Sequence, residues 1–400
     1  MVDFNKKILK NGITVVVEKR DLPIVSLAIC NKFGAISETS EIKGVAHFIE
    51  HLLFTGTESR SNEDLSREIE KKGGILNGFT SQELTAFWFK LPSEHLFAGL
   101  DILTDMLNNP KFDEEKFEKE KKVILEEINM YGDDPASSAM ELLEKKLFDK
   151  PFGEGVIGSK ETISSMKRDD VKKLFEEGYN PSNYIVAAVG DVDFDKLCDY
   201  LESNFESNGK EIKKIAVKEL NGEEVEERDG IDQAHFTLGI HAPRAGSPDY
   251  YALRVLDGYL ANGMSSRLFL EIREKRGLAY FVKSSIDSDK DYSYYGIYVG
   301  TTKENIDEVK EIILEELKKV EGISEKDFEE SKQRLIGLDK ISREESVNVL
   351  RGLLYSENLG MIEDFYEFES KMDEVKIEDV QRLAKELSEK KYSTAAVVPK

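Results

Sequence analysis

The sequence predicts an α+β fold built from two homologous units, each an antiparallel-rich sheet packed by helices. The chain has 400 residues, more than one typical domain. Strand and helix signals recur in the same order in both halves, and one acidic helix recurs in part 211 positions later. The matching pairs are Glu114 and Glu325, Phe117 and Phe328, Glu118 and Glu329, and Lys121 and Lys332.

The first half alternates between strand and helix signals after a hairpin that turns at Asn11-Gly12. The expected strands are 13–18, 24–31, two strands within 75–91, and 184–190. The expected helices are 41–54, 61–72, several up to residue 148, others near 160–177, and 193–205. A polar stretch rich in Lys and Glu, 206–230, is the expected connection to the second half.

The second half repeats this order of elements. It is expected to contain a strand at 234–241, helices at 249–260 and 264–275, strands within 278–300, helices to about 389, and a strand at 392–398. Residues 1–215 and 226–400 are therefore predicted to be the two domains.

The most informative motif is His47-Phe-Ile-Glu50-His51, which lies in the expected helix 41–54. Residues at i, i+3 and i+4 share one helical face, so two imidazoles and one carboxylate project together. Such a pair of histidines can bind Zn²⁺, and the glutamate can accept a proton from the attacking water. A helix that merely packs in the core would explain the apolar neighbours, but it would leave these three polar groups without partners.

A catalytic zinc site normally has three protein ligands, and the motif supplies two. The acidic helix 112–128 offers many carboxylates as the third ligand, among them Glu126 and Glu127. Spacing alone does not choose between them.

The motif and the later run Glu120-Lys-Lys-Val-Ile-Leu-Glu-Glu127 resemble the pitrilysin-type (M16) metallopeptidases. This family, which includes mitochondrial processing peptidase and insulin-degrading enzyme, carries the inverted His-x-x-Glu-His signature of the inverzincins. The resemblance implies a pitrilysin/LuxS-like metallohydrolase fold of the processing-peptidase type. It also implies that His47, His51 and Glu127 hold the metal, that Glu50 is the general base, and that Glu120 supports the ligands from behind.

Residues 73–91 resemble a second motif of the same family, with Asn77 in register and Gly78 where the family usually has Ala. Asn77 and Gly78 are therefore expected to bind substrate. The β-rich run Leu84 to Leu91 is, by resemblance, an edge strand that pairs with an extended peptide; from the sequence alone an ordinary sheet strand is an equal alternative.

The stretch Arg273-Glu-Lys-Arg-Gly-Leu-Ala-Tyr280 is a third match. In the family, such an Arg and Tyr come from the second half, bind the substrate backbone and stabilise the oxyanion of the tetrahedral intermediate. Taken alone, the segment indicates a charged helix that runs into a strand, with Arg273 at the end of the helix and Tyr280 at the start of the strand.

The second half cannot build the same metal site, because the 211-residue offset places Ser331 at the position of Glu120 and Leu338 at that of Glu127. We therefore expect 1–215 to be the catalytic zinc domain and 226–400 to be a substrate-binding domain that has lost the metal. The remaining histidines, His95, His235 and His241, are scattered and are assigned no metal role.

The composition narrows the class of partners. The formal net charge of −23 argues against nucleic acid, whose phosphates would be repelled. No uncharged run reaches the ~18 residues that span a bilayer, and the first residues do not form a secretory leader. Cys30 and Cys198 are isolated within apolar or amphipathic segments, as expected of reduced thiols. We expect a cytoplasmic protein without nucleic-acid or membrane partners.

The resemblance implies a zinc-dependent endopeptidase, with one Zn²⁺ per chain, that cleaves short or unfolded peptides in a chamber formed by paired domains. It also implies that two chains pair, most often as a homodimer. The alternative is a non-catalytic binding or assembly subunit, but such members usually lack a metal ligand or the general base, and here none is missing. A structural zinc site is a weaker alternative interpretation, because such sites prefer four protein ligands that are rich in Cys.

Overall fold

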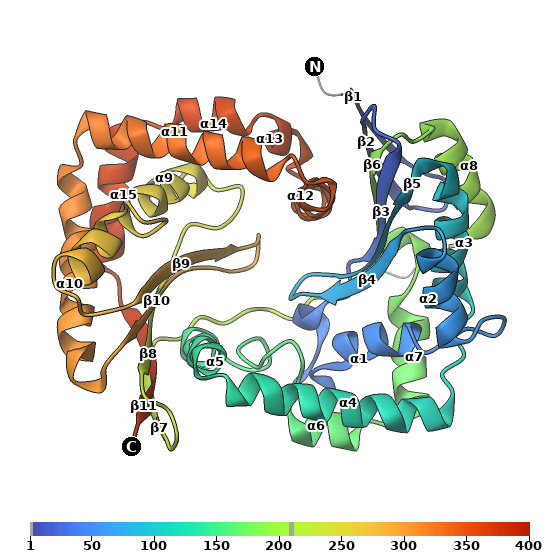
Figure 1. Ribbon diagram of the computed structural model, residues 1–400, viewed down its shortest axis with the longest axis horizontal. Coiled ribbons are helices and arrows are strands. Elements are labelled where there is room, and N and C mark those ends of the chain that lie inside the picture. The colour runs from blue at the N-terminus through green and yellow to red at the C-terminus, as the bar shows by residue number, and fades with distance from the viewer. Residues whose placement is uncertain (1–2, 208–211) are drawn as a thin grey trace. The chain divides into compact units, whose positions relative to one another are not determined.

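The computed structural model describes residues 3–207 and 212–400 (Figure 1). The chain forms two compact units, each assembled from separate stretches of sequence. Unit 1 comprises Met1–Ile128, Glu154–Ile215 and Ser342–Gly360, and unit 2 comprises Asn129–Gly153, Ala216–Ile341 and Met361–Lys400. Each unit contains one sheet covered by helices, which confirms the predicted α+β class.

Unit 1 contains a six-stranded sheet in the order β1-β2-β6-β3-β5-β4. Its strands are β1 (Asp3–Ile8), β2 (Thr14–Lys19), β3 (Ile24–Asn31), β4 (Ile75–Thr80), β5 (Thr85–Pro92) and β6 (Tyr184–Gly190). Strands β2 and β6 are parallel, and the other neighbouring pairs are antiparallel. The predicted hairpin between β1 and β2 is confirmed, and Gly12 in its turn has a φ of +90°, which favours glycine.

Eight α-helices of the described chain belong to unit 1 in whole or in part. They are α1 (Val45–Leu53), α2 (Asn62–Glu70), α3 (Leu96–Asn108), α4 (Glu114–Asp133), α6 (Lys160–Ser165), α7 (Arg168–Gly178), α8 (Phe194–Asn204) and α12 (Ser346–Leu359). Helix α1 is shorter than the predicted helix 41–54, because two 3₁₀ turns, Ala35–Ser37 and Ser40–Ile42, precede it.

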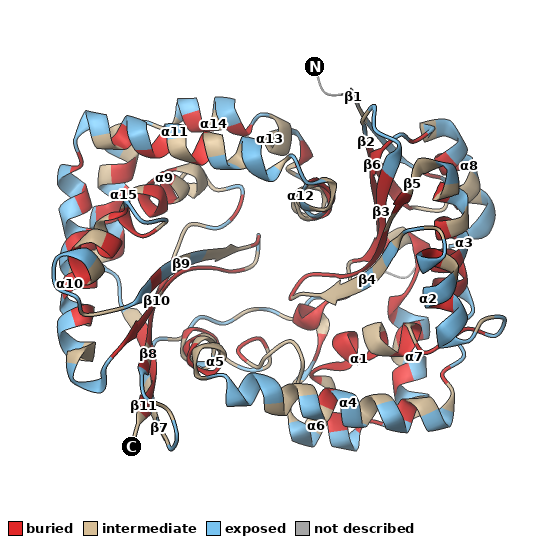
Figure 2. Cartoon of the chain, viewed as in Figure 1, coloured by how far each residue is buried: buried red, intermediate tan, exposed pale blue. Residues whose placement is uncertain are grey.

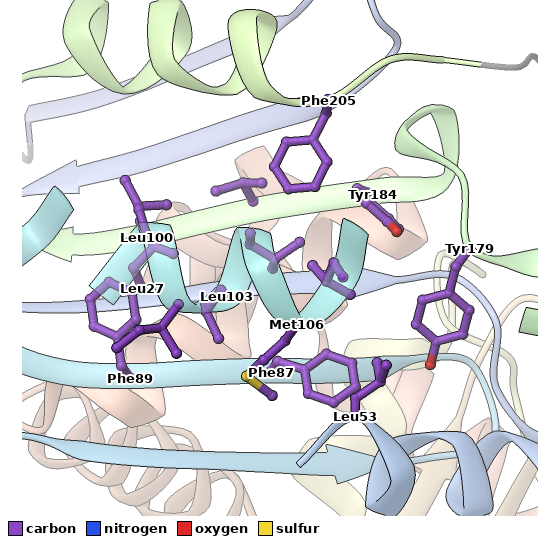
Figure 3. Packing of buried hydrophobic residues seen from close by; sticks show 14 of the residues in the cluster. Leu27, Leu53, Phe87, Phe89, Leu100, Leu103, Met106, Tyr179, Tyr184 and Phe205 are labelled. Atoms are coloured by element: carbon purple, nitrogen blue, oxygen red, sulfur yellow. The ribbon is translucent and has the colours of Figure 1, made fainter. Parts of the chain in front are cut away.

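The core of unit 1 lies between the sheet and its helices. Figure 3 shows Leu27 of β3 and Phe89 of β5 beside Leu100 and Leu103 of α3. Helical spacing places the apolar residues of α3 on one face, which covers the sheet. Along β3 and β6 nearly every residue is buried, whereas α8 exposes one side (Figure 2).

Of the two alternatives for Leu84 to Leu91, the ordinary sheet strand is confirmed and the substrate-binding edge strand is wrong. Strand β5 is internal, because it pairs with β3 on one side and with β4 on the other. Strand β4 is the edge strand beside β5, and among the described residues it pairs only with β5. The apolar run in β5 reflects burial rather than an exposed edge: its first five residues are all buried, whereas β4 has exposed and half-buried residues only.

Unit 2 contains a five-stranded sheet in the order β7-β11-β8-β10-β9. Its strands are β7 (Glu223–Arg228), β8 (Ala234–His241), β9 (Phe281–Ser288), β10 (Ser293–Thr301) and β11 (Tyr392–Pro399). As in β2-β6-β3-β5-β4 of unit 1, the first pair is parallel and the others are antiparallel. The shared strand order and directions agree with the predicted duplication of one unit.

Strand β7 lies inside the stretch 206–230 that was predicted to be a connection only, so the prediction is wrong for that part. The strand is polar because it forms an edge and alternates between exposed and half-buried residues. Residues 208–211 of the stretch lie outside the described chain.

The helices of unit 2 flank its sheet. They are α5 (Pro135–Leu147), α9 (Tyr250–Leu260), the π-helical segment Phe269–Glu274, α10 (Ile306–Lys319), α11 (Glu325–Ser342), α13 (Ile362–Tyr366), α14 (Phe368–Glu374) and α15 (Ile377–Glu389). The helix predicted at 264–275 is thus shorter than expected. None of the helices in the described chain combines the length and the apolar character that crossing a membrane would require.

Each half of the sequence supplies one helix to the sheet of the other half. Helix α5 packs on β8 and β11 of unit 2, and α12 packs on β3 and β6 of unit 1. Their first residues, Pro135 and Ser346, are again 211 positions apart, so the exchange follows the repeat. The units are therefore discontinuous, unlike the segments 1–215 and 226–400 that the sequence suggested.

Candidate metal centre

Helix α1 of unit 1 carries the histidine motif. Its start depends on Gly44, which has a φ of +93°, and a Cβ there would lie 2.6 Å from the carbonyl oxygen of Ile157. Phe48 and Ile49 are fully buried and anchor the helix in the core. The i, i+3, i+4 spacing then places His47, Glu50 and His51 on one face, as predicted.

A buried carboxylate, Glu38, caps the start of α1. It accepts hydrogen bonds from the N–H groups of Gly44 (2.9 Å) and Ala46 (2.7 Å), and the ammonium of Lys43 lies 3.6 Å away. Burial raises the pKa of Glu38, although Lys43 and the two N–H groups oppose this shift. No sequence pattern indicates this cap, because Glu38 lies farther from the helix than a normal N-cap and matches no capping motif.

Helix α4 brings two carboxylates to the motif. Oε2 of Glu127 lies 3.7 Å from Nε2 of His47 and 3.5 Å from Nε2 of His51. Oε2 of Glu120 lies 3.3 Å from Nδ1 of His51, on the other side of that ring. The stacked rings of Phe48 and Phe117, 4.8 Å apart, join the two helices.

The donor set fits a zinc ion. One ligand atom from each of His47, His51 and Glu127 can be chosen so that all three lie within 4.8 Å of one another. Ligand atoms on a tetrahedral zinc lie about 3.3 Å apart, given bond lengths of ~2.0–2.1 Å, so the measured separations need little adjustment. Two imidazole nitrogens and one carboxylate oxygen are also the donor set of many catalytic zinc sites.

The other acidic and histidine residues lie outside this group. In the part of the chain that the structure describes, no second group of three such residues is placed to hold a metal. Glu126, the alternative ligand, is exposed and is not part of the group. His235 bonds to the hydroxyl of Tyr298, and His241 bonds to the carbonyl of Leu220.

Glu50 lies between the histidines and the edge strand β4. Its Oε2 accepts a hydrogen bond of 2.6 Å from the hydroxyl of Thr80. Gly78 packs against the same carboxylate, and a Cβ on Gly78 would lie 2.8 Å from Oε1 of Glu50. Asn77 accepts a hydrogen bond of 2.8 Å from the N–H of Gly78 and lines a cavity beside Glu50. The sequence predicted Asn77 and Gly78 near the site but gave Thr80 no role.

The pKa values of the two histidines in the site are shifted in opposite directions. Burial, together with the charge of the neighbouring His51, lowers the pKa of His47 to about 4. Burial would also lower the pKa of His51, but hydrogen bonds to Glu120 and Glu127 outweigh it and raise this pKa to about 9. Burial raises the pKa of Glu50, whereas the hydrogen bond from His51 lowers the pKa of Glu127. Protonated His51 therefore carries a positive charge between the carboxylates of Glu120 and Glu127.

Zinc affinity should rise with pH because the metal must displace this proton. His47 is already neutral above pH ~4 and Glu127 is ionised, so His51 supplies the only proton to be lost. We expect the affinity to rise about tenfold per pH unit between pH 6 and 8, with a plateau near pH 9. Competition with a fluorescent chelator across this range measures the slope.

The matched control for this titration is Glu120→Gln. Because Glu120 helps to raise the pKa of His51, its replacement should lower that pKa and move the plateau to a lower pH. A flat affinity profile in the unmodified protein would contradict the assignment of His51 as a ligand that binds in exchange for a proton.

Arg273 and Tyr280 lie together in unit 2. Arg273 is in the π-helical segment, Tyr280 immediately precedes β9, and the guanidinium lies 5.0 Å from the centre of the tyrosine ring. Tyr280 is 61% exposed, so its hydroxyl is free to meet a ligand. The expected action of this pair on a substrate at the metal centre stays a prediction.

Comparisons with known proteins agree with the resemblance noted from the motifs. A family model described as "Insulinase (Peptidase family M16)" matches residues 14–160, and one described as "Peptidase M16 inactive domain" matches residues 165–335. An uncharacterized zinc protease of Bacillus subtilis (strain 168) is 32% identical over 401 residues, covering 98% of this chain and 97% of that protein. One of Mycobacterium leprae (strain TN) is 33% identical over 406 residues, covering 98% and 91%.

Solved structures support the fold. A protease from Helicobacter pylori superposes with a TM-score of 0.93 at 24% identity and covers 100% of both chains. A structure titled as a peptidase M16 inactive domain from Pseudomonas fluorescens superposes with a TM-score of 0.90 at 18% identity, covering 100% of this chain and 98% of that one. At these identities the likeness establishes the fold, and the predicted pitrilysin-like architecture is confirmed.

Proposed function

Because the chain belongs to peptidase family M16, we propose that it is a zinc-dependent endopeptidase that cleaves short or unfolded peptides. The observation that carries the proposal is the convergence of His47, His51 and Glu127, from two helices, beside the buried carboxylate of Glu50. One Zn²⁺ per chain is expected, because the described residues contain one such group.

The residues of unit 1 divide the chemistry between them. When bound, zinc acts as a Lewis acid and lowers the pKa of a coordinated water to ~7. His47, His51 and Glu127 would hold the ion, and Glu120 would keep the His51 ring in the orientation that directs Nε2 to the metal. Glu50 accepts the proton of the attacking water and returns it to the leaving amine. Its raised pKa makes the Glu50 carboxylate a stronger base for the first step than a solvent-exposed glutamate would be.

The peptide is proposed to add as a further strand at the free edge of β4. Such addition satisfies the outward N–H and C=O groups of an edge strand and holds the peptide extended. Glu50 lies directly against Gly78 of β4 and accepts a hydrogen bond from Thr80, so a strand added there would run past the general base. Gly78 leaves room for this close approach, since a side chain would press on the Glu50 carboxylate.

Arg273 and Tyr280 are proposed to bind the substrate backbone and the oxyanion from the second unit. A guanidinium and a phenol are suitable hydrogen-bond donors for that charge, and the cation–π contact between them holds both side chains in one place. Pairing of two chains, and a chamber that admits unfolded rather than folded substrates, complete the proposal. The family resemblance supports them, and light scattering of the purified protein would test the pairing.

The decisive experiment is digestion of a mixed peptide library with and without a zinc chelator, analysed by mass spectrometry. We expect cleavage within peptides, its loss with the chelator and its recovery when zinc is added. Cleavage that persists without metal would refute the proposal. Zinc-loaded protein that cleaves no peptide would favour the alternative, a non-catalytic binding or assembly subunit, although such a subunit has no need of a complete set of ligands and base.

Replacing Thr80 with Val should shift the pH dependence of cleavage. The hydroxyl donates to the ionised carboxylate of Glu50 and lowers its pKa, so its loss should raise that pKa further. Because the base must be ionised to act, the acid limb of the kcat/KM profile should move to higher pH. Activity at pH 6 should fall more than activity at pH 8, with the zinc content unchanged. An unshifted profile would contradict the role of Thr80.

A further inference from the structure

A cavity of about 510 Å³ opens beside Glu50 and His51 in unit 1. Its walls come from α1 and the turn after it, from α2, from β4 and from α4. Phe54 and Leu76 supply an apolar surface, and Lys116 and Lys119 of α4 supply two ammonium groups. The cavity therefore joins the proposed reaction centre to a site that is both apolar and cationic.

The two lysines bring positive charge that no anion neutralises. The ammonium of Lys116 bonds to neutral oxygens only, the carbonyl of Thr55 and, at 2.9 Å, the side chain of Asn62. Lys119 is exposed, and within residues 3–207 and 212–400 it makes no ion pair or side-chain hydrogen bond. Two ammonium groups without a carboxylate partner in one cavity are unexpected in a chain with a formal net charge of −23.

The carboxylates that line the cavity are engaged elsewhere. Glu50 accepts the hydrogen bond of Thr80, and Glu120 contacts the ring of His51. Both carboxylates therefore lie on the side of the cavity that is next to the proposed metal ligands. Lys116 and Lys119 lie one turn apart near the start of α4. A ligand that enters from the reaction centre meets the apolar residues and the lysines together.

We propose that this cavity binds a carboxylate of the peptide substrate, next to the bond that is cleaved, through Lys116 and Lys119. The inference rests on the proposed peptidase function and gives it a substrate class. The carboxylate has two possible sources, the side chain of an Asp or Glu residue or the C-terminus of the peptide. In either case the aliphatic part of the bound residue lies against Phe54 and Leu76.

The size and chemistry of the cavity suit such a ligand. A volume of about 510 Å³ holds a complete amino-acid side chain and leaves space for solvent. A lysine ammonium acts as a flexible point charge, so it accepts carboxylates on side chains of different length. Because Lys119 is exposed, solvent screens its charge, and we expect a preference of about fivefold rather than an absolute requirement.

The test compares peptides that differ at one position beside the cleaved bond, with Glu, Gln or Lys there, each with a free or an amidated C-terminus. If a side chain is bound, kcat/KM should be about fivefold higher for Glu than for Gln, and lowest for Lys. If the C-terminus is bound, the free acid should exceed the amide by the same factor whatever the side chain.

Lys119→Glu should abolish this preference and favour the Lys or amidated peptides. Lys122→Glu is the matched control, because it makes the same change of charge on the same helix but does not line the cavity. The control should retain the preference of the unmodified protein. The preference should also weaken as the salt concentration rises.

Two results would overturn the proposal without touching the peptidase function: equal cleavage of all the peptides, or equal rankings in Lys119→Glu and Lys122→Glu. Binding of the same labelled peptides to Glu50→Gln, followed by fluorescence anisotropy, gives a readout that does not depend on catalysis. If no peptide is cleaved, the peptidase function fails, and equal affinities for the Glu, Gln, Lys and amidated peptides would then overturn the carboxylate site as well.

Discussion

Replacing Glu50 with Gln is expected to reduce peptide hydrolysis by about 10³-fold while the protein still binds zinc. Glutamine keeps the shape of the side chain and a partner for the Thr80 hydroxyl, but it cannot accept the proton of the attacking water. Glu50 does not belong to the group of metal ligands, so the metal content should stay at that of the unmodified protein. Initial rates on one peptide, with metal content measured on the same samples, give both quantities.

The matched control for this substitution is Glu58→Gln, an exposed glutamate just after α1. It removes the same charge near the same helix and should leave the rate within a factor of about two. If Glu50→Gln cleaved peptides at the normal rate, Glu50 could not be the general base. A loss of zinc together with activity would instead place Glu50 among the groups that hold the metal.

Replacing Glu127 with Gln is expected to weaken zinc binding by more than about 100-fold, since even the loss of an outer partner of a metal ligand costs 10–100-fold. The oxygen of Glu127 faces Nε2 of both histidines, and an amide oxygen carries no charge to offset that of the ion. The variant should therefore emerge from gel filtration with little zinc and cleave peptides only in excess metal. Elemental analysis and chelator competition measure these effects.

Glu126→Gln is the natural control, because Glu126 is the neighbouring glutamate on α4 and the other ligand candidate in the sequence. Its side chain is exposed and lies outside the group of ligand atoms, so zinc affinity should remain unchanged. The reverse pattern, with zinc lost from Glu126→Gln and kept by Glu127→Gln, would mean that α4 presents the other carboxylate to the metal.

The two copies of the repeat differ in the side chains that form the candidate metal site. Helices α4 and α11 begin at Glu114 and Glu325, at the 211-residue offset of the repeat. At the position of Glu127, α11 has Leu338, which is 43% exposed and cannot bind a metal. The two units share their strand order, so the difference between them arises from a few side chains rather than from the fold.

The helix exchange has a consequence for unit 1. Helix α12 comes from the second half of the sequence, and Arg351 of α12 lies 5.1 Å from the ring centre of Phe79 on the edge strand β4. Tyr355 of the same helix also stacks on Phe79. The strand proposed to hold the peptide is therefore supported from both halves of the chain, and the first half alone would not complete it.

Some predictions came directly from local patterns. Local patterns predicted the hairpin at Asn11-Gly12, most strands and the histidine helix, because turn chemistry and residue periodicity act over a few residues. The duplication could be predicted because the same order of elements recurs along the chain. The shared face of His47, Glu50 and His51 followed from helix geometry alone. For residues 84–91 the sequence left an edge strand and an ordinary sheet strand as equal alternatives, because an apolar run does not indicate how many strands flank it.

The α+β class, the repeat and the shared face of the two histidines and their glutamate could all be predicted from the sequence, because residue periodicity and recurring patterns along the chain indicate them. Spacing along α4 did not choose between Glu126 and Glu127, and the packing of α4 on α1 shows that Glu127 faces both imidazoles. The contacts of Glu38 with the start of α1 and of Thr80 with Glu50 likewise appear only in the folded chain. These contacts join segments far apart in the chain. Their geometry depends on how helices and strands pack, and no local pattern records that packing.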